Sequence, residues 1–209
     1  MTLHTVLEDP ACIDLQLETG RVPVYLPLLH LSEPWNARAA RDQLCKRIWS
    51  CADPEREILR LLDGLDWRPH LSGAVAATLL PSPRVVAALW SAHDAGSWVA
   101  PQLGAVASLV DEDFDQRAIA RVVRLPRIDR DAWMLRAEEE GRGSELPPAA
   151  RDAKALTNLL TLLSRRPGLK LWSKAQRARP EVSGLYTPAI LLENQDQLSS
   201  QWLDRWHKL

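Results

Sequence analysis

The sequence predicts a mainly α fold, a HEAT-like helical repeat array (α-solenoid), with a small β-hairpin confined to the first 31 residues. An internal duplication is the main observation behind this prediction. Trp67 is followed six residues later by Gly73-Ala74-Val75-Ala76, and Trp98 is followed six residues later by Gly104-Ala105-Val106-Ala107. The offset between the two copies is 31 residues (98 − 67). Such an offset is typical of a helix-turn-helix unit, which buries its apolar face by stacking on a neighbour.

Composition and helix punctuation are the other two observations. The chain has 209 residues, of which 46% are apolar and 25% charged, so it can bury a sizeable core. Helix-capping residues and apolar stripes also follow one another along most of its length. We therefore expect residues 1–31 to form an arm packed on the helices, and residues 32–209 to form a single helical repeat domain.

The N-terminal arm shows the alternation of a half-buried hairpin. Apolar and polar residues alternate on both sides of Thr19-Gly20, the apolar ones being Ile13, Leu15, Leu17, Val22, Val24 and Leu26. We predict a turn at Gly20, with Pro23 and Pro27 confining the second strand to an edge. An extended arm is the alternative interpretation.

Helices are predicted from Ser32 onward. The first helix begins there and buries a stripe made of Ala37, Ala40, Leu44 and Ile48. The second begins at Asp53-Pro54, an N-cap residue followed by a proline in the first turn, and its stripe consists of Ile58, Leu61, Leu62 and Leu65. Further helices follow the punctuating residues Asp66, Ser82 and Ser97.

The second copy of the duplication has its start fixed by a proline. Pro101 would break a helix interior, so the helix that carries Gly104 is expected to begin within Trp98–Ala100. Gly73 and Gly104 are each trailed by alanines, which favours close approach of a neighbouring helix over a ligand site.

An acidic cluster and a row of arginines follow the duplication. The cluster consists of Asp111, Glu112, Asp113 and Asp115 around Phe114, and helix capping explains part of it. Arg117, Arg121 and Arg124 recur at spacings of four and three, so they share one face of the next helix. A solvated face is the usual meaning of such a row. With Arg127 and Arg130 it could instead form a basic strip.

The C-terminal half contains an apolar island around Trp133 and an acidic run, Glu138, Glu139 and Glu140, which opens a predicted surface loop at about 138–148. A helix over about 149–164 follows, with a stripe made of Leu156, Leu159, Leu160 and Leu163. The last helix, from Asp196, carries Leu198, Trp202, Trp206 and Leu209 along one side. We expect it to cap the end of the array.

Several functional classes are disfavoured by what the sequence contains. Net charge is −1 and the pI is about 6.5, so no global basic field attracts nucleic acid or an anionic membrane. Cys12, Cys45 and Cys51 lack metal-ligand spacing, and His70 and His93 match no zinc motif. No apolar run approaches the roughly 20 residues of a membrane span. We expect a cytoplasmic protein that is not an enzyme and holds no cofactor or metal.

The duplicated region carries a family resemblance. The stretches LDWRPHLSGAVAATLL, ALWSAHDAGSWVAPQLGAVASLVDEDF and ARDAKALTNLLTLLSRRPG resemble the HEAT-like helical proteins that are encoded beside bacterial polymorphic toxins. The resemblance covers Asp53 to Phe114 and, more faintly, Ala150 to Gly168. It implies an immunity protein that binds and blocks a cognate toxin, and it transfers no particular binding residue.

Together these observations predict a protein-binding module whose partner is a toxin, possibly a basic one. Acidic clusters can steer a basic partner, and a tryptophan is a typical anchor of an interface. The predicted contact residues are Asp111, Glu112, Asp113, Asp115, Trp133, Glu138, Glu139 and Glu140. The alternative is a HEAT-like nucleic-acid-binding protein that tracks phosphates with the arginine strip.

Overall fold

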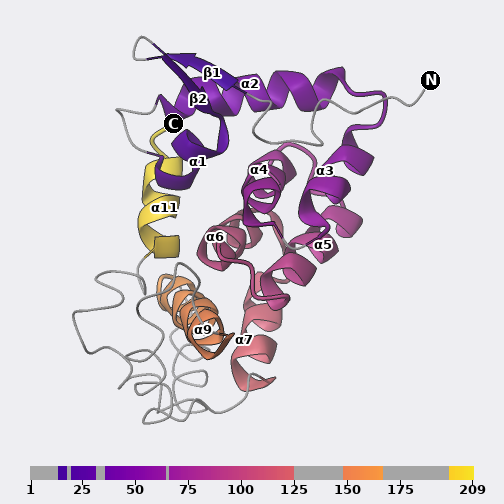
Figure 1. Ribbon diagram of the computed structural model, residues 1–209. Helices are drawn as coiled ribbons and strands as arrows, with labels where there is room; N and C mark the ends of the chain where they lie inside the picture. Colours follow the sequence, from indigo (N-terminus) through magenta and orange to yellow (C-terminus); the bar gives the residue numbers. More distant parts are fainter. Residues whose placement is uncertain (1–13, 18–19, 32–35, 65, 125–147, 167–197) are drawn as a thin grey trace.

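The computed structural model describes residues 14–17, 20–31, 36–64, 66–124, 148–166 and 198–209, and this part of the chain is mainly helical, as predicted. Figure 1 shows three layers: α4, α6 and α9 lie in the middle, α3, α5 and α7 on one side, and α1 and α11 on the other. The helices are α1 (Tyr25–His30), α2 (Ala37–Ser50), α3 (Pro54–Leu62), α4 (Trp67–Ala77), α5 (Pro83–Asp94), α6 (Ala100–Val110), α7 (Phe114–Arg124), α9 (Pro148–Ser164) and α11 (Leu198–Trp206).

A two-stranded antiparallel sheet precedes the helices. Strand β1 (Asp14–Leu17) pairs with β2 (Gly20–Pro23), so that Leu17 lies opposite Gly20. The sheet occupies the region where the sequence predicts a hairpin, but the second strand ends at Pro23. Its predicted continuation to Leu26 is wrong, because the chain turns into α1.

Helix α1 forms because its apolar residues also fit a helical period. Val24, Leu28 and Leu31 are separated by four and three residues and are all buried. Pro27 lies in the first turn, where its missing N–H is not needed. Leu31 then ends the helix in a left-handed conformation (φ 46°), and its N–H donates to the Pro27 carbonyl over 2.9 Å.

The predicted faces of α2 and α3 are confirmed as far as Leu62, where α3 ends, and Leu65 of the predicted stripe lies outside the described residues. The four stripe residues of α2 are all buried, as are Ile58, Leu61 and Leu62 of α3. Asp53 caps α3 as predicted, since its carboxylate accepts the Arg56 N–H over 3.0 Å. The start of α2 differs from the prediction, since the helix begins at Ala37 instead of Ser32. Asn36 tolerates the left-handed backbone conformation before the helix (φ 50°), and its side-chain oxygen accepts the Ala39 N–H.

Helices α3 to α9 pack as pairs on pairs. Within pairs, α3 contacts α4, α5 contacts α6 and α7 contacts α9. Between pairs, α3 contacts α5, α4 contacts α6 and α6 contacts α9. Asp66 and Ser82 cap α4 and α5 as predicted, and α6 begins at Ala100. Its N-cap residue is Val99 and not Ser97, although the Ser97 hydroxyl accepts the Val99 N–H over 3.4 Å.

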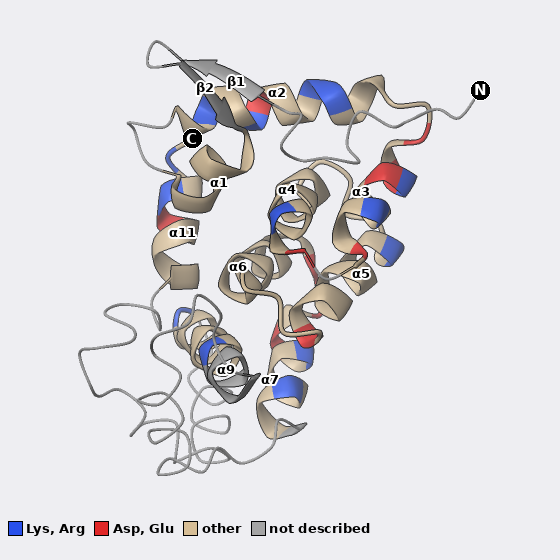
Figure 2. Ribbon diagram, in the orientation of Figure 1, with Lys and Arg blue, Asp and Glu red and all other residues tan. Residues whose placement is uncertain are grey.

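The middle helices α4 and α6 are covered on both sides. Every residue from His70 to Ala77 and from Ala100 to Ala107 is buried. A helix with neighbours on both sides requires small, apolar side chains on all its faces. Helix α6 contains no charged residue and is tan throughout in Figure 2. The small residues of the duplication therefore serve close packing, as the sequence analysis predicts.

The two duplicated glycines both lie at helix crossings, but with different clearance. A Cβ atom at Gly73 would lie 2.9 Å from Leu62 Cγ and 3.0 Å from Leu61 Cβ. At Gly104 it would lie 3.5 Å from methyl groups of Leu159 and Leu162, which is an ordinary contact. Only the crossing of α3 and α4 requires the absence of a side chain.

Helix α11 lies along the side of the central helices and not across one end of them, so the prediction that it forms an end cap is wrong. It packs on α6 and α9 and bonds to α1, whose last carbonyls lack partners within so short a helix. The Trp202 indole N–H donates to the Leu28 carbonyl over 2.9 Å, and Arg205 donates to the His30 carbonyl over 2.6 Å. The first and last described helices thus form one layer (Figure 1).

None of the described helices combines the length and apolar character that crossing a bilayer requires.

The difference between the two crossings predicts opposite effects of alanine substitution. Gly73→Ala should destabilise the protein by about 1–2 kcal/mol, because the overpacking penalty exceeds the gain in helix propensity. Gly104→Ala should be neutral or stabilise by up to about 1 kcal/mol. Urea unfolding followed by circular dichroism measures both, and equal losses in the two variants would contradict this placement.

Candidate functional site

Asp111, the first residue of the predicted acidic contact, is buried and has structural partners. It is the C-cap residue of α6, and its carboxylate accepts the Trp90 indole N–H over 2.6 Å. The Asp113 N–H also donates to it over 3.0 Å, and Arg117 lies 3.5 Å away. Asp111 therefore joins α5 to the turn before α7. Because its carboxylate is buried and paired, it is not available for contact with a partner.

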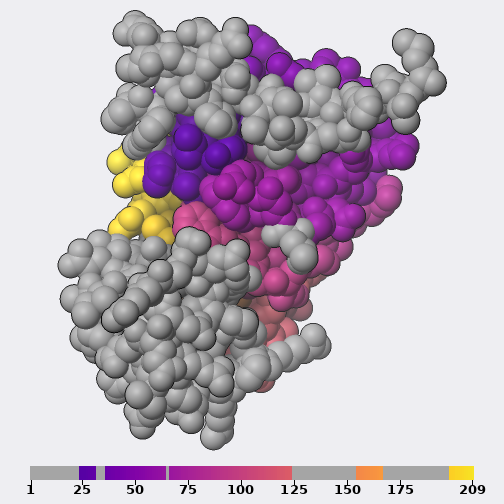
Figure 3. All heavy atoms as spheres, viewed as in Figure 1, coloured from indigo at the N-terminus to yellow at the C-terminus, as the bar shows by residue number. Residues whose placement is uncertain are grey.

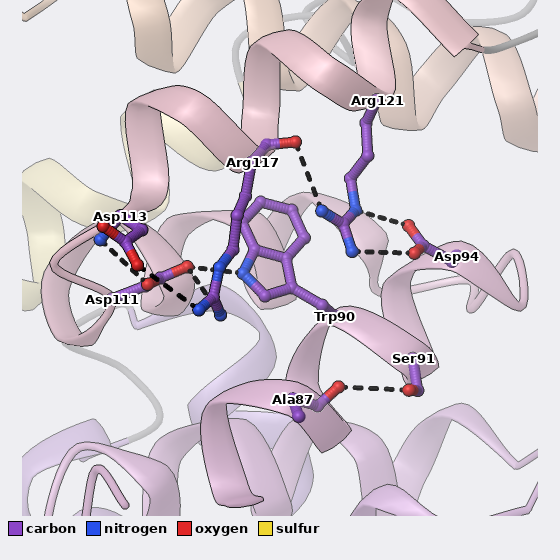
Figure 4. Close-up of polar contacts among 8 residues, drawn as sticks. All are labelled: Ala87, Trp90, Ser91, Asp94, Asp111, Asp113, Arg117 and Arg121. Atoms are coloured by element: carbon purple, nitrogen blue, oxygen red, sulfur yellow. Dashed lines mark hydrogen bonds and ion pairs between the residues drawn. The ribbon is translucent and has the colours of Figure 1, made fainter. Parts of the chain in front are cut away.

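Trp90 is the centre of this cluster (Figure 4). The Arg121 guanidinium lies 3.9 Å from the centre of the Trp90 ring and binds Asp94 through two contacts of 2.7 and 2.8 Å. Phe114 stacks on the same tryptophan at 5.8 Å. Planar guanidinium groups suit this combination of ring stacking and bidentate pairing. The cluster thereby fixes α7 against α5.

Most described members of the acidic cluster and of the arginine row are paired with opposite charges, although Arg117 is the one arginine of the row that pairs within the described part of the cluster. Glu112 and Asp113 are exposed, but Asp113 pairs with Arg117 at 3.5 Å, and Asp115 pairs with Arg166 of the α9 end at 3.5 Å. Such pairing reduces the negative charge that could attract a basic partner and the positive charge that could bind phosphates. The other predicted contacts and strip residues lie outside the described side chains: Trp133, Glu138, Glu139, Glu140, Arg124, Arg127 and Arg130.

A second group, which the sequence analysis did not assign as a site, consists of Tyr25, Trp67 and Trp98. We call these three residues the aromatic row. The Tyr25 and Trp67 rings lie 5.4 Å apart edge to face, and the Trp67 and Trp98 rings lie 5.0 Å apart. Trp98 is 37% exposed. Parts of α1, α4 and α6 adjoin one another on the face seen in Figure 3.

The duplication explains how the row forms. Trp67 is the first residue of α4, and Trp98 lies two residues before the start of α6. Because α4 and α6 pack side by side, the two tryptophans meet at one edge. The duplication was therefore a usable signal for this contact, but the sequence did not show that Trp98 would be exposed or that Tyr25 would join it.

Two cations lie on the aromatic row. The Arg68 guanidinium lies 4.9 Å from the Trp67 ring centre and 5.7 Å from that of Tyr25. The Lys154 ammonium lies 4.4 Å from the Trp98 ring centre and donates to the Trp98 carbonyl over 2.9 Å. Cation–π contacts stabilise such pairs by about 0.5–2 kcal/mol, more when they are shielded from water.

Lys154 is the most strongly perturbed of these groups. Its side chain is buried, and burial lowers the pKa of Lys154 from its usual 10.5 to about 8. Within the described residues no carboxylate pairs with it. A buried cation without a counter-ion reduces stability, and strongly perturbed groups are enriched at functional sites.

A buried serine–histidine contact lies behind Trp98. The His70 Nδ1 atom is 2.9 Å from the Ser97 hydroxyl. Burial lowers the pKa of His70, and the Gly64 carbonyl opposes this effect. A neutral imidazole beside a serine is the arrangement of a nucleophile and its base. Here the hydroxyl also accepts the Val99 N–H, so the contact fixes the loop that carries Trp98.

His93, the other histidine named in the sequence analysis, is buried, and its Nδ1 atom lies 3.2 Å from an Asp94 oxygen. Among the described residues, His, Cys, Asp and Glu side chains form no group that could hold a metal ion.

Comparisons with known proteins add no assignment, since no family model, curated protein or solved structure matches this chain.

The environment of Lys154 predicts a pH dependence of stability. Because the folded chain releases this proton at about pH 8 and the unfolded chain at about 10.5, the free energy of unfolding should rise between these values as the unfolded state binds the extra proton. Lys154→Met should remove that rise and stabilise the protein at pH 7 by on the order of 1–3 kcal/mol.

Exposed Lys46 on α2 provides the matched control, since Lys46→Met should leave the profile unchanged. Urea unfolding at several values from pH 7 to 11 measures the effect. If the free energy of unfolding depends on pH in the same way in the wild type and in Lys154→Met, the lysine is not buried without a counter-ion as described.

Proposed function

We propose that this chain is a protein-binding module that neutralises a partner protein, and specifically an immunity protein that blocks a bacterial toxin in the cytoplasm. The observation that carries the proposal is the aromatic row. Its member Trp98 is 37% exposed in the turn before α6 and contacts Trp67, and tryptophans of this kind are frequent anchors of interfaces.

Two unfavourable features occur at the same place, which strengthens the case for function. The indole of Trp98 leaves apolar surface in water, and the buried ammonium of Lys154, which has no counter-ion among the described residues, reduces the stability of the free protein. Local departures from favourable packing and charge pairing are expected at functional sites, where binding or activity takes precedence over stability. A partner that covers Trp98 would remove the first of these penalties.

The proposed architecture is a HEAT-like repeat array formed by the pairs α3–α4, α5–α6 and α7–α9. Their pair-on-pair contacts support it. The inner side of such an array is often the binding surface, but here α1 and α11 cover the α4, α6 and α9 side. We therefore propose that the partner binds at the edge where α4 and α6 begin.

The other predicted features have secondary places in this proposal. Exposed Glu112 and Asp113 could steer a basic region of the partner toward the molecule. The alternative of nucleic-acid binding is less well supported, because Arg117 and Arg121 are engaged by carboxylates. The proposal includes no catalytic role, cofactor or metal.

Substitution at the aromatic row tests the proposal. The chain would be used to capture its partner from the source cells, and the partner would be co-expressed with it in a growth assay. Trp98→Ala should weaken the complex at least about 30-fold, corresponding to about 2 kcal/mol, and abolish protection from the partner. The free chain should lose about 1–2 kcal/mol of stability with the contacts of the ring to Trp67 and Lys154, and circular dichroism should show that it is still folded at the temperature of the assay.

Trp49, which is 55% exposed on α2, gives the matched control, and Trp49→Ala should bind and protect like the wild type. Equal binding by Trp98→Ala, or a captured partner whose action on growth the chain does not prevent, would refute the proposed function.

A further inference from the structure

We infer that the segment of the partner that occupies the aromatic row is acidic and apolar: it presents a carboxylate to Arg68 and an adjacent apolar side chain to Trp98. The inference rests on the proposed function and specifies the chemistry of the partner at that site. It follows from the charges around the row and from which surfaces of its rings are already covered.

Arg68 is positioned to receive a carboxylate. Its guanidinium lies over the rings of Trp67 and Tyr25, which hold the group in place. Its nearest carboxylate oxygen, on Asp66, is 3.5 Å away, and the same oxygen accepts the Arg68 backbone N–H over 3.0 Å. Asp66 and the Tyr25 side chain engage part of the guanidinium, which has more N–H donors than these two groups can use and so keeps donors for an incoming carboxylate.

The charge balance around the row also favours an acidic segment. Arg68 and Lys154 contribute two cations, while the described carboxylate in contact with them is that of Asp66. At neutral pH Lys154 is largely protonated, since its pKa is about 8. A basic segment would be repelled at short range, whereas an acidic one would be attracted.

The ring contacts favour an apolar side chain over a stacked nucleobase. Trp98 has the Lys154 ammonium on its ring and Trp67 beside it, and Trp67 in turn has Arg68 on its ring. Binding of single-stranded nucleic acid by stacking requires free ring faces. The remaining exposure of Trp98 therefore suits contact with an aliphatic or aromatic side chain.

Selection from a random peptide library on the immobilised full chain tests the inference. The enriched peptides should carry at least two more Asp or Glu than Lys or Arg, with an apolar residue beside a carboxylate. A labelled peptide of this kind should bind at least about 10-fold more weakly to Arg68→Glu and to Trp98→Ala. Replacing its carboxylates by amides should have a similar effect.

Arg56 is exposed in the first turn of α3 and provides a control of equal charge, so Arg56→Glu should bind like the wild type. Enrichment of basic peptides, no enrichment, undiminished binding to Arg68→Glu, or binding of an oligothymidine in place of peptides would each overturn the inference.

The proposed function and the acidic segment can be refuted independently of each other. If the natural partner requires Trp98 while the selected peptides are basic or ignore Arg68, the proposed function stands and the acidic segment is wrong. If acidic peptides bind through Arg68 but Trp98→Ala still protects against the partner, the proposed function at this site is wrong.

Discussion

The fold depends on burying two helices, α4 and α6, from both sides. Each has a helix of its own pair on one side and α1 or α11 on the other, and each also packs on the other. This arrangement excludes charge and bulk from most of their positions, which accounts for the Gly and Ala residues of the duplicated stretches. It also brings their starting residues to one edge, so Trp67 and Trp98 come into contact.

Features that depend on local sequence were predictable. The caps Asp53, Asp66 and Ser82 and the buried stripes of α2, α3 and α9 require only neighbours within a helix turn or two. Helix α1 was missed because Val22, Val24 and Leu26 fit a strand, whereas the next buried positions, Leu28 and Leu31, fit a helix. The position of α11 was missed because periodicity identifies the buried face but not the element that covers it.

The candidate sites were harder to predict because their members come from distant parts of the chain. The acidic cluster looked like a surface patch, since nothing in the sequence indicated that Trp90 and Arg117 would engage Asp111. The aromatic row unites Tyr25 with the two duplicated tryptophans, and Lys154 joins Trp98 from 56 positions later in the chain. Only the packing of α9 and α1 on the central helices brings these groups together.

Amide hydrogen exchange of the free protein, resolved by residue, tests the central position of α4 and α6 most directly. In the exchange regime governed by opening equilibria, their amides should exchange only with global unfolding and be the slowest in the molecule, since they are covered on both sides. The amides of α1 and α11 should open at lower free energy, because these helices form an outer layer. Faster exchange in α4 and α6 than in the outer helices would contradict the account.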